Sequence, residues 1–282
     1  MEHYGIRLER AMDQYGHVCV GIDPHPQLLS DWGLGVNAEG LRTFGLRVVE
    51  AMAGTVGVVK PQSALFEQCG SAGIAALEDV LAAARDAGLL TILDVKRGDI
   101  GSTMAGYARA YLSDDSPLRA DAITLSPYLG FGSLAPAIDL ADQTGRGIYV
   151  LTLTSNPEGA QVQHARGSSG RWVAGEIAAC VGDHNTRDRD EGHLGSVGMV
   201  IGATVGDAVA QAGIDLAATN ASVLAPGVGA QGAGPDQVKQ VFGSAVANVL
   251  ASSSRGILSH GPALADLRRA AVETTGRIEK LL

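Results

Sequence analysis

Two acids and a base lie within six residues of one another, directly after an apolar run. The run covers residues 89–93, and Asp94, Lys96 and Asp99 follow it. Because side chains alternate along a strand, we expect Asp94 and Lys96 to point to the same side. Charges at the end of a buried strand are costly unless they pair or take part in chemistry. The chemistry open to this set is proton transfer and electrostatic stabilisation of a charged intermediate. The alternative is an ion pair that only closes the strand end.

Other apolar runs also end in polar or charged residues. Asp23 follows the run at 18–22, Lys60 follows the run at 56–59, and Ser126 follows the run at 122–125. Each has an ordinary explanation by itself, such as a turn or a strand end. Together, however, the set of Lys60, Asp94, Lys96 and Asp99 carries two positive and two negative charges. It needs no metal ion for neutrality, so we expect neither a metal nor a cofactor.

A candidate anion site follows the last two apolar runs. Residues 225–234 form a glycine-rich stretch that contains Pro226 and Gln231, and Arg255 follows the final run. Glycines let backbone N–H groups converge on a phosphate, and arginine gives two directed hydrogen bonds to it. The stretch lacks the Gly-Lys-Ser/Thr ending of a Walker loop.

Short apolar runs alternate with helical patterns along the whole chain. The runs cover residues 18–22, 56–59, 89–93, 122–125, 148–153, 197–201, 222–225 and 245–250. Helical faces are indicated by Leu41, Phe44, Val48 and Met52, by Ile74, Leu77, Leu81 and Ala84, and by a final helix opened by Pro262. Strands that alternate with helices indicate a parallel sheet, and eight of them favour a closed barrel. We therefore predict one (β/α)8 TIM-barrel domain over residues 1–282, whose chemistry lies at the carboxyl ends of the strands.

One segment, at about residues 164–195, is long for a connection. Residues 170–180 are compatible with a helix, and the remainder is predicted to be an exposed loop. His164, His184 and His193 lie in this segment, but their spacing matches no metal-ligand pattern. We therefore expect them to be solvated loop histidines.

Composition limits the cellular role of the protein. Hydrophobic residues make up 46% of the 282 residues, and the formal net charge of −9 argues against binding to nucleic acid or to an anionic membrane. Three scattered cysteines are too few for a disulfide framework or a zinc site. The N-terminus lacks the apolar core of a signal peptide, and no uninterrupted apolar stretch approaches about 18 residues. A cytoplasmic location is expected.

Taken in order, these motifs resemble those of the orotidine 5′-phosphate decarboxylase family over nearly the whole chain. They are Gly21-Ile-Asp23, Val-Lys60-Pro61, DVKRGDIGST at residues 94–103, Pro226-Gly-Val-Gly-Ala-Gln231-Gly, and Ser-Arg255-Gly. The long segment at 164–195 and the sequence SPYLG at 126–130 are similar to the longer microbial branch of that family. In that branch asparagine more often precedes Pro-Tyr, where this chain has Ser126. Serine also donates and accepts a hydrogen bond, so we expect a variation in base contact.

The resemblance implies a role for each of these residues. The charged tetrad is Lys60, Asp94, Lys96 and Asp99, and Asp99 reaches the site of a neighbouring subunit in a homodimer with shared active sites. The implied substrate contacts are Asp23 and Lys60 with the ribose hydroxyls, Ser126 and Gln231 with the pyrimidine, Gln231 and Arg255 with the phosphate, Pro226 and Ile100 with the pocket, and Thr103 across the dimer interface.

The implied reaction is the cofactor-independent decarboxylation of orotidine 5′-phosphate to uridine monophosphate in pyrimidine biosynthesis. Two alternatives remain at this stage. A metal-dependent sugar-phosphate lyase or aldolase of the same superfamily shares the D-x-K-x-x-D core, but its pattern has a metal-binding glutamate where this chain has Lys60. An ammonium there repels Mg²⁺. A non-catalytic nucleotide-binding barrel explains the phosphate loops, but leaves the cost of gathering four charges unexplained.

Overall fold

Eight parallel strands pair in chain order and close into a barrel, because β1 pairs with both β2 and β8. The computed structural model describes residues 2–229 and 232–282. The strands are β1 (Val18–Ile22), β2 (Val58–Pro61), β3 (Leu90–Arg97), β4 (Ala122–Leu125), β5 (Gly147–Leu153), β6 (Val197–Ile201), β7 (Val223–Pro226) and β8 (Val249–Ser253). The predicted (β/α)8 barrel is confirmed.

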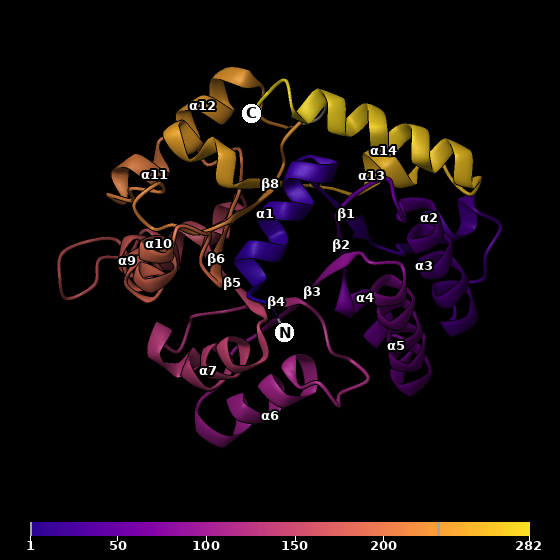
Figure 1. Cartoon of the computed structure of the whole chain (residues 1–282), viewed down its shortest axis with the longest axis horizontal. Coiled ribbons are helices and arrows are strands. Elements are labelled where there is room, and N and C mark those ends of the chain that lie inside the picture. The colour runs from indigo at the N-terminus through magenta and orange to yellow at the C-terminus, as the bar shows by residue number, and fades with distance from the viewer. Residues whose placement is uncertain (1, 230–231) are drawn as a thin grey trace.

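Helices surround the barrel as an outer ring (Figure 1). The ring is continuous where α3 packs on α5, α6 on α7, and α14 on α3. The α-helices are α1 (Tyr4–Tyr15), α2 (Pro26–Asp31), α3 (Ala38–Met52), α4 (Ser63–Glu67), α5 (Gly70–Asp86), α6 (Gly101–Leu112), α7 (Ala135–Thr144), α8 (Ala160–Gln163), α9 (Val173–His184), α10 (Thr186–Glu191), α11 (Ala208–Gln211), α12 (Pro235–Phe242), α13 (Arg255–Leu258) and α14 (Leu264–Ile278). Short 3₁₀ turns are η1 (Phe131–Leu134), η2 (Pro157–Gly159) and η3 (Gly243–Asn248).

The apolar residues divide into two cores. The larger core lies between the barrel and the helices and includes Phe44, Val80 and Ile123. The smaller core fills the barrel and includes Cys19 and Tyr149. A barrel filled by side chains leaves no pore, so a ligand has room only at one of its ends.

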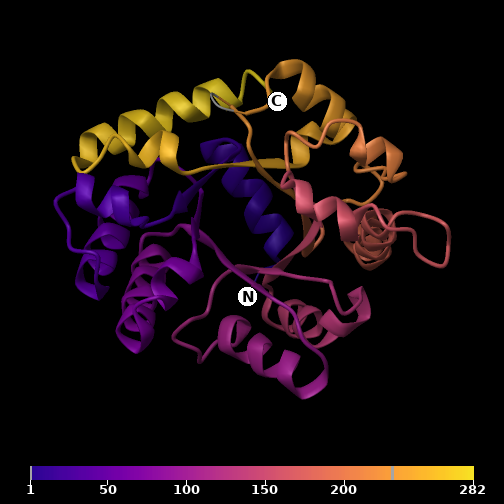
Figure 2. The same cartoon turned by 180° about the vertical axis from the view of Figure 1, so that it is seen from behind.

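Helix α1 closes the amino-terminal end of the barrel, where it crosses the middle of the strands in both views (Figures 1 and 2). Tyr4 and Leu8 belong to the inner core, and the Tyr4 hydroxyl lies 3.0 Å from that of Tyr149. Gly147 permits this approach, because a Cβ atom there would lie 2.3 Å from the Tyr4 ring. The carboxyl ends of the strands remain available for a site.

Several predicted boundaries differ from the structure. Strand β3 runs to Arg97, four residues beyond the apolar run at 89–93, and includes Asp94 and Lys96 as expected. The predicted strand at 245–250 is wrong over its first four residues, because residues 245–248 belong to η3 and β8 begins at Val249. A short apolar run satisfies either structure, so its period does not distinguish them. The final helix begins at Leu264, two residues after Pro262.

The long segment at 164–195 contains more structure than predicted. The expected helix at 170–180 is α9, and the expected exposed loop contains a further helix, α10. Asn185 joins the two helices. Its buried side chain donates hydrogen bonds to the carbonyls of Val197 and Thr219, at 2.8 and 3.1 Å. These bonds tie the segment to the barrel. Among the described residues, no helix is long and apolar enough to cross a membrane.

Candidate active site

Asp94 stands between two lysines at the carboxyl end of the barrel. Its Oδ2 lies 2.9 Å from Nζ of Lys60, the next-to-last residue of strand β2. Its Oδ1 lies 2.5 Å from Nζ of Lys96, on the same strand as Asp94. The prediction that Asp94 and Lys96 share one side of the strand is confirmed. The Asp94 and Lys60 side chains are only 6% and 10% exposed, whereas that of Lys96 is 46% exposed. Lys96 is therefore the ammonium that a ligand can reach.

Two neutral side chains complete the surroundings of Asp94. The Thr124 hydroxyl donates to Oδ1 at 2.8 Å, and the Gln62 amide donates to Oδ2 at 3.2 Å. Each carboxylate oxygen thus receives one charged and one neutral donor. A buried carboxylate with this many partners is fixed in orientation.

The backbone at Lys96 is unusual. Its φ is +45°, a conformation that residues other than glycine seldom adopt, and the pairing of β3 with β4 shifts register between Leu93 and Arg97. The Thr124 hydroxyl accepts a hydrogen bond from the Lys96 N–H at 3.0 Å. Strain of this kind persists only where neighbouring groups hold it. Thr124 therefore holds both the backbone of Lys96 and the carboxylate of Asp94.

The charges stabilise one another. Burial opposes ionisation of Asp94, but the ammonium groups of Lys60 and then Lys96 outweigh it and hold the pKa of Asp94 well below its usual range. Burial also opposes the charge on Lys60, yet attraction to Asp94 and Asp23 raises the pKa of Lys60 above its ordinary value. Both groups are therefore ionised at neutral pH.

A cavity of about 340 Å³ opens beside these charges. Its lining includes Asp94 and Lys96 together with apolar side chains from three later strands, namely Leu151, Val200 and Leu224. The cavity thus offers a planar ring an apolar surface and a fixed ammonium. The two lysines beside the Asp94 carboxylate repel a divalent cation, so binding of such an ion in this cavity is unfavourable.

Asp23 lies where the sequence places it, at the rim of the same cavity. Its Oδ1 is buried and has no hydrogen-bond partner in the part of the chain that the structure describes. A buried acceptor without a donor is costly, so a ligand hydroxyl would satisfy it.

Three predicted residues do not reach the cavity of their own chain. Asp99 lies beyond the strand end, where its Oδ1 accepts a hydrogen bond from the Ile100 N–H at 2.8 Å. Ile100 is 62% exposed, and Thr103 is exposed on α6. None of the three is among the described residues that line the cavity. They are available to a second subunit.

Ser126 is half-buried after β4 and is not among the described residues that line the cavity. Its N–H donates to the carbonyl of Arg97 at 2.8 Å, so it joins the ends of β3 and β4. Thr154 lines the cavity instead. The sequence singled out neither Thr154, which follows β5, nor Thr124, which lies within β4, because threonine is common in strands and in the turns beside them.

The residues predicted to bind the phosphate follow two neighbouring strands, β7 and β8. Pro226 lines the cavity and pairs with Ser252 in the sheet. Arg255 lines a second cavity of about 490 Å³, together with Gly229 and Arg277. Ser252 and Ser254 line the first cavity, whereas Ser253 and Arg255 line the second. Arg255, which begins α13 just after β8, thus lines a different cavity from Asp94. Gln231 lies outside the described residues.

We expect Thr124→Val to lower kcat by about tenfold, because the change removes both hydrogen bonds that position Lys96 and Asp94. Thr124→Ser keeps the hydroxyl and should remain within about threefold of the wild type. The measurement is kcat for each variant at saturating substrate. Equal kcat values for the valine and serine variants would show that the hydroxyl has no positioning role.

Comparison with known proteins identifies relatives along nearly the full length. A model of the orotidine 5′-phosphate decarboxylase / HUMPS family matches residues 16–270. An orotidine 5′-phosphate decarboxylase from Streptomyces coelicolor is 54% identical over 271 residues, which are 96% of this chain and 95% of the relative. The crystal structure of a Streptomyces avermitilis protein assigned to the same activity is 52% identical, with a TM-score of 0.94 over 100% of this chain and 96% of the other. The structure of Leishmania donovani OMP decarboxylase is 28% identical, with a TM-score of 0.77 and coverages of 99% and 98%.

Proposed function

Because the chain belongs to the orotidine 5′-phosphate decarboxylase / HUMPS family, we propose that it converts orotidine 5′-phosphate to uridine monophosphate and CO₂ with the charges around Asp94. The observation that carries this assignment is the pair of lysines on one buried carboxylate, at the carboxyl end of a barrel. Family membership supplies the activity, and the geometry supports the residue roles that follow.

Loss of CO₂ leaves negative charge on C6 of the pyrimidine, and we assign Lys96 to meet it. Its ammonium is fixed by Asp94 and remains accessible from the cavity. A fixed ammonium stabilises the carbanion as it develops and then donates a proton to C6. The electron pair of the broken C–C bond stays on C6, so this route uses no external electron acceptor.

Asp94 contributes negative charge next to the departing carboxylate. Two unit charges about 4 Å apart repel by about 4 kcal/mol at an effective dielectric constant near 20. Lys60 and Lys96 offset part of that repulsion, because both contact the same carboxylate. We therefore assign the larger share of catalysis to Lys96, and to Asp94 the orientation of both lysines.

Asp23 and Lys60 are assigned to the ribose. Asp23 offers a buried acceptor at the cavity rim, and Lys60 is charged beside it. A hydroxyl can donate to the first and accept from the second. The ribose would thereby set the position of the pyrimidine relative to Lys96.

A decarboxylation assay with EDTA present tests the function. We expect full turnover of orotidine 5′-phosphate, since the charged set leaves no favourable place for a divalent cation. Loss of activity in EDTA that returns with Mg²⁺ would favour a metal-dependent lyase of the same superfamily. Nucleotide binding without turnover would favour a non-catalytic barrel. The curated relatives favour neither alternative.

We also propose a homodimer with shared sites. Large apolar side chains are exposed on the loops after β3 and β4, where Ile100, Tyr128 and Leu129 are 62%, 75% and 52% exposed. The two loops lie close together, because a Cβ on Gly98 would be 2.5 Å from the carbonyl oxygen of Ser126. Exposed apolar side chains on two adjacent loops beside Asp99 support burial against a second copy of the chain.

Arg255→Ala should raise KM by about 30-fold or more, because a charge-assisted contact to phosphate is lost. The side chain lies at a strand end beside Gly229, so it needs to turn only locally to meet a phosphate. The measurement is kcat/KM of the variant and the wild type for the nucleotide and for orotidine, which lacks the phosphate. Equal losses on both substrates would assign Arg255 another role.

A further inference from the structure

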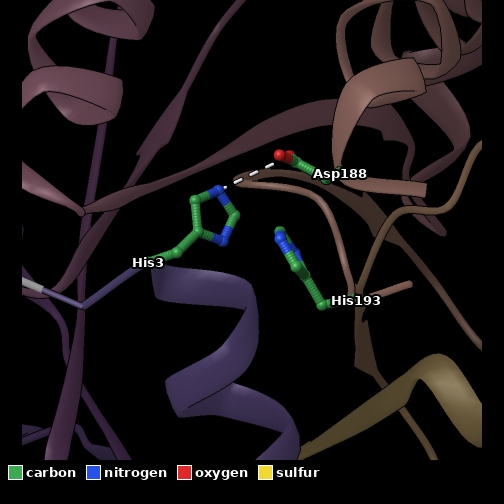
Figure 3. A group of neighbouring side chains, drawn as sticks. All are labelled: His3, Asp188 and His193. Atoms are coloured by element: carbon green, nitrogen blue, oxygen red, sulfur yellow. Dashed lines mark ion pairs between the residues drawn. The ribbon is translucent and has the colours of Figure 1, made fainter. Parts of the chain in front are cut away.

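A second group of chemically competent side chains lies at the opposite end of the barrel from Asp94. His3 precedes α1, Asp188 lies in α10, and His193 precedes β6. One ligand-capable atom from each lies within 4.8 Å of the others, although His3 is 185 residues from Asp188 in sequence. Figure 3 shows the three side chains converging on one point. The expectation that His193 is a solvated loop histidine is wrong, because its side chain is 14% exposed.

The separations suit a transition metal. Nε2 of His3 lies 3.5 Å from Oδ2 of Asp188, and the two imidazole rings are 4.6 Å apart between centroids. A tetrahedral Zn²⁺ with bonds of about 2.0–2.1 Å separates its ligand atoms by roughly 3.4 Å. The distance of 3.5 Å between His3 and Asp188 is already close to this ligand separation, so a small movement of the imidazole rings would complete a tetrahedral site.

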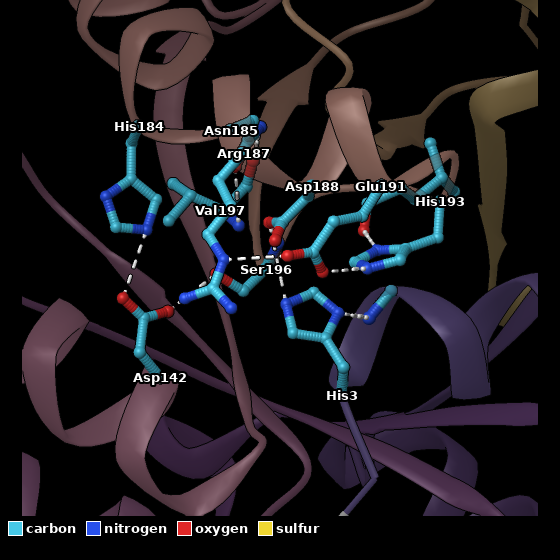
Figure 4. Close-up of polar contacts among 12 residues, drawn as sticks. His3, Asp142, His184, Asn185, Arg187, Asp188, Glu191, His193, Ser196 and Val197 are labelled. Atoms are coloured by element: carbon cyan, nitrogen blue, oxygen red, sulfur yellow. Dashed lines mark hydrogen bonds and ion pairs between the residues drawn. The ribbon is translucent and has the colours of Figure 1, made fainter.

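Neighbouring groups orient two of the donors (Figure 4). Nδ1 of His193 donates a hydrogen bond to the carbonyl oxygen of Leu194 at 3.0 Å, so in the neutral ring Nε2, which faces Glu191, is the nitrogen that can bind a metal. Asp188 Oδ2 accepts a hydrogen bond from the Ser196 N–H at 3.2 Å. Glu191 Oε2 lies 3.4 Å from Nε2 of His193 and can supply a fourth oxygen.

We propose that His3, Asp188 and His193 bind one divalent transition-metal ion of the Zn²⁺ type, with Glu191 or water as the fourth ligand. The ion joins the start of α1 to α10 and to the loop before β6. Two imidazoles and a carboxylate suit Zn²⁺ and Co²⁺ better than Mg²⁺ or Ca²⁺, which prefer oxygen ligands.

His3 changes its hydrogen bonding when the ion binds. Its Nδ1 accepts a hydrogen bond from the Gly5 N–H at 3.2 Å, so in the neutral ring the proton lies on Nε2, facing Asp188. Coordination through Nε2 needs the other tautomer, with the proton on Nδ1. One helix-capping bond is therefore exchanged for a metal–nitrogen bond.

The position of the site predicts its effect. Helix α1, which His3 caps, closes the amino-terminal end of the barrel, whereas Asp94 lies at the carboxyl end. Bound metal should thus raise the melting temperature and leave decarboxylation unchanged, since it binds the folded chain preferentially.

Titration of the EDTA-treated, dialysed enzyme with Co²⁺ tests the proposal. We expect one Co²⁺ per chain, a visible spectrum of tetrahedral cobalt, competition by Zn²⁺, and a higher melting temperature with Zn²⁺. His3→Ala and His193→Gln should each weaken Co²⁺ binding by about 10- to 100-fold. His184→Ala is the matched control, because His184 pairs with Asp142 at 3.3 Å outside the cluster. That variant should bind as the wild type does.

Failure of the unaltered enzyme to bind Co²⁺ or Zn²⁺ at micromolar concentrations would overturn the proposal, and this result needs no variant to fold. Binding that is equal in the wild type, His3→Ala and His193→Gln would overturn it as well. Full decarboxylation activity of each variant establishes that it is folded, so a loss of metal binding in an active variant is assigned to the removed ligand.

Discussion

Lys96→Ala is expected to lower kcat by at least about 10²–10⁴-fold while the protein still binds uridine monophosphate. The change removes the group that stabilises charge at C6 and supplies the proton, but leaves the cavity walls in place. Asp94 keeps its contact with Lys60 at 2.9 Å, so the buried carboxylate remains paired and the fold is retained. The measurements are single-turnover decarboxylation and product binding by calorimetry.

Lys239→Ala provides the control, since Lys239 is exposed on α12 and lines neither the cavity beside Asp94 nor the cavity that contains Arg255. It should retain the wild-type rate. A Lys96→Ala variant that keeps more than a few per cent of wild-type turnover would show that another group protonates C6. Loss of uridine monophosphate binding in the same variant would instead point to a damaged site.

Mixing inactive Lys96→Ala and Asp99→Ala proteins should restore activity. Asp99 lies beyond the end of β3 and is not among the described residues that line its own cavity. If Asp99 completes the site of the partner, a mixed dimer contains one site with both defects and one site with neither. Random exchange makes half of the dimers mixed, so about one quarter of all sites should recover.

The readout is the decarboxylation rate after subunit exchange, which is followed independently by fluorescence transfer between labelled subunits. Wild-type enzyme taken through the same exchange controls for losses in handling. If Asp99 serves its own subunit, every site keeps one defect and mixing restores nothing. Complete exchange without recovery would therefore end the shared-site proposal.

Sequence periodicity determined the barrel, because buried parallel strands are short apolar runs and the helices between them have their own period. It also located Lys60, Asp94 and Lys96, since carboxyl ends of parallel strands converge at one end of a closed barrel. Strand position brings these three residues to one end of the barrel, and the structure places all three within one ion-paired group. The motif residues of this group also carried the resemblance to the family.

Tertiary structure alone decided which neutral side chain holds the ion-paired group of Lys60, Asp94 and Lys96. It also decided which histidines meet at the amino-terminal end of the barrel. Thr124 lies inside an apolar strand, so its two hydrogen bonds depend on the shifted register between β3 and β4 and on the left-handed backbone of Lys96. Local pattern carries no signal for either feature. His3 and His193 meet only because α1 folds across the barrel end, a contact between segments about 190 residues apart. Side-chain pairing over such separations is set by packing of the whole chain, and no spacing rule in the sequence encodes it.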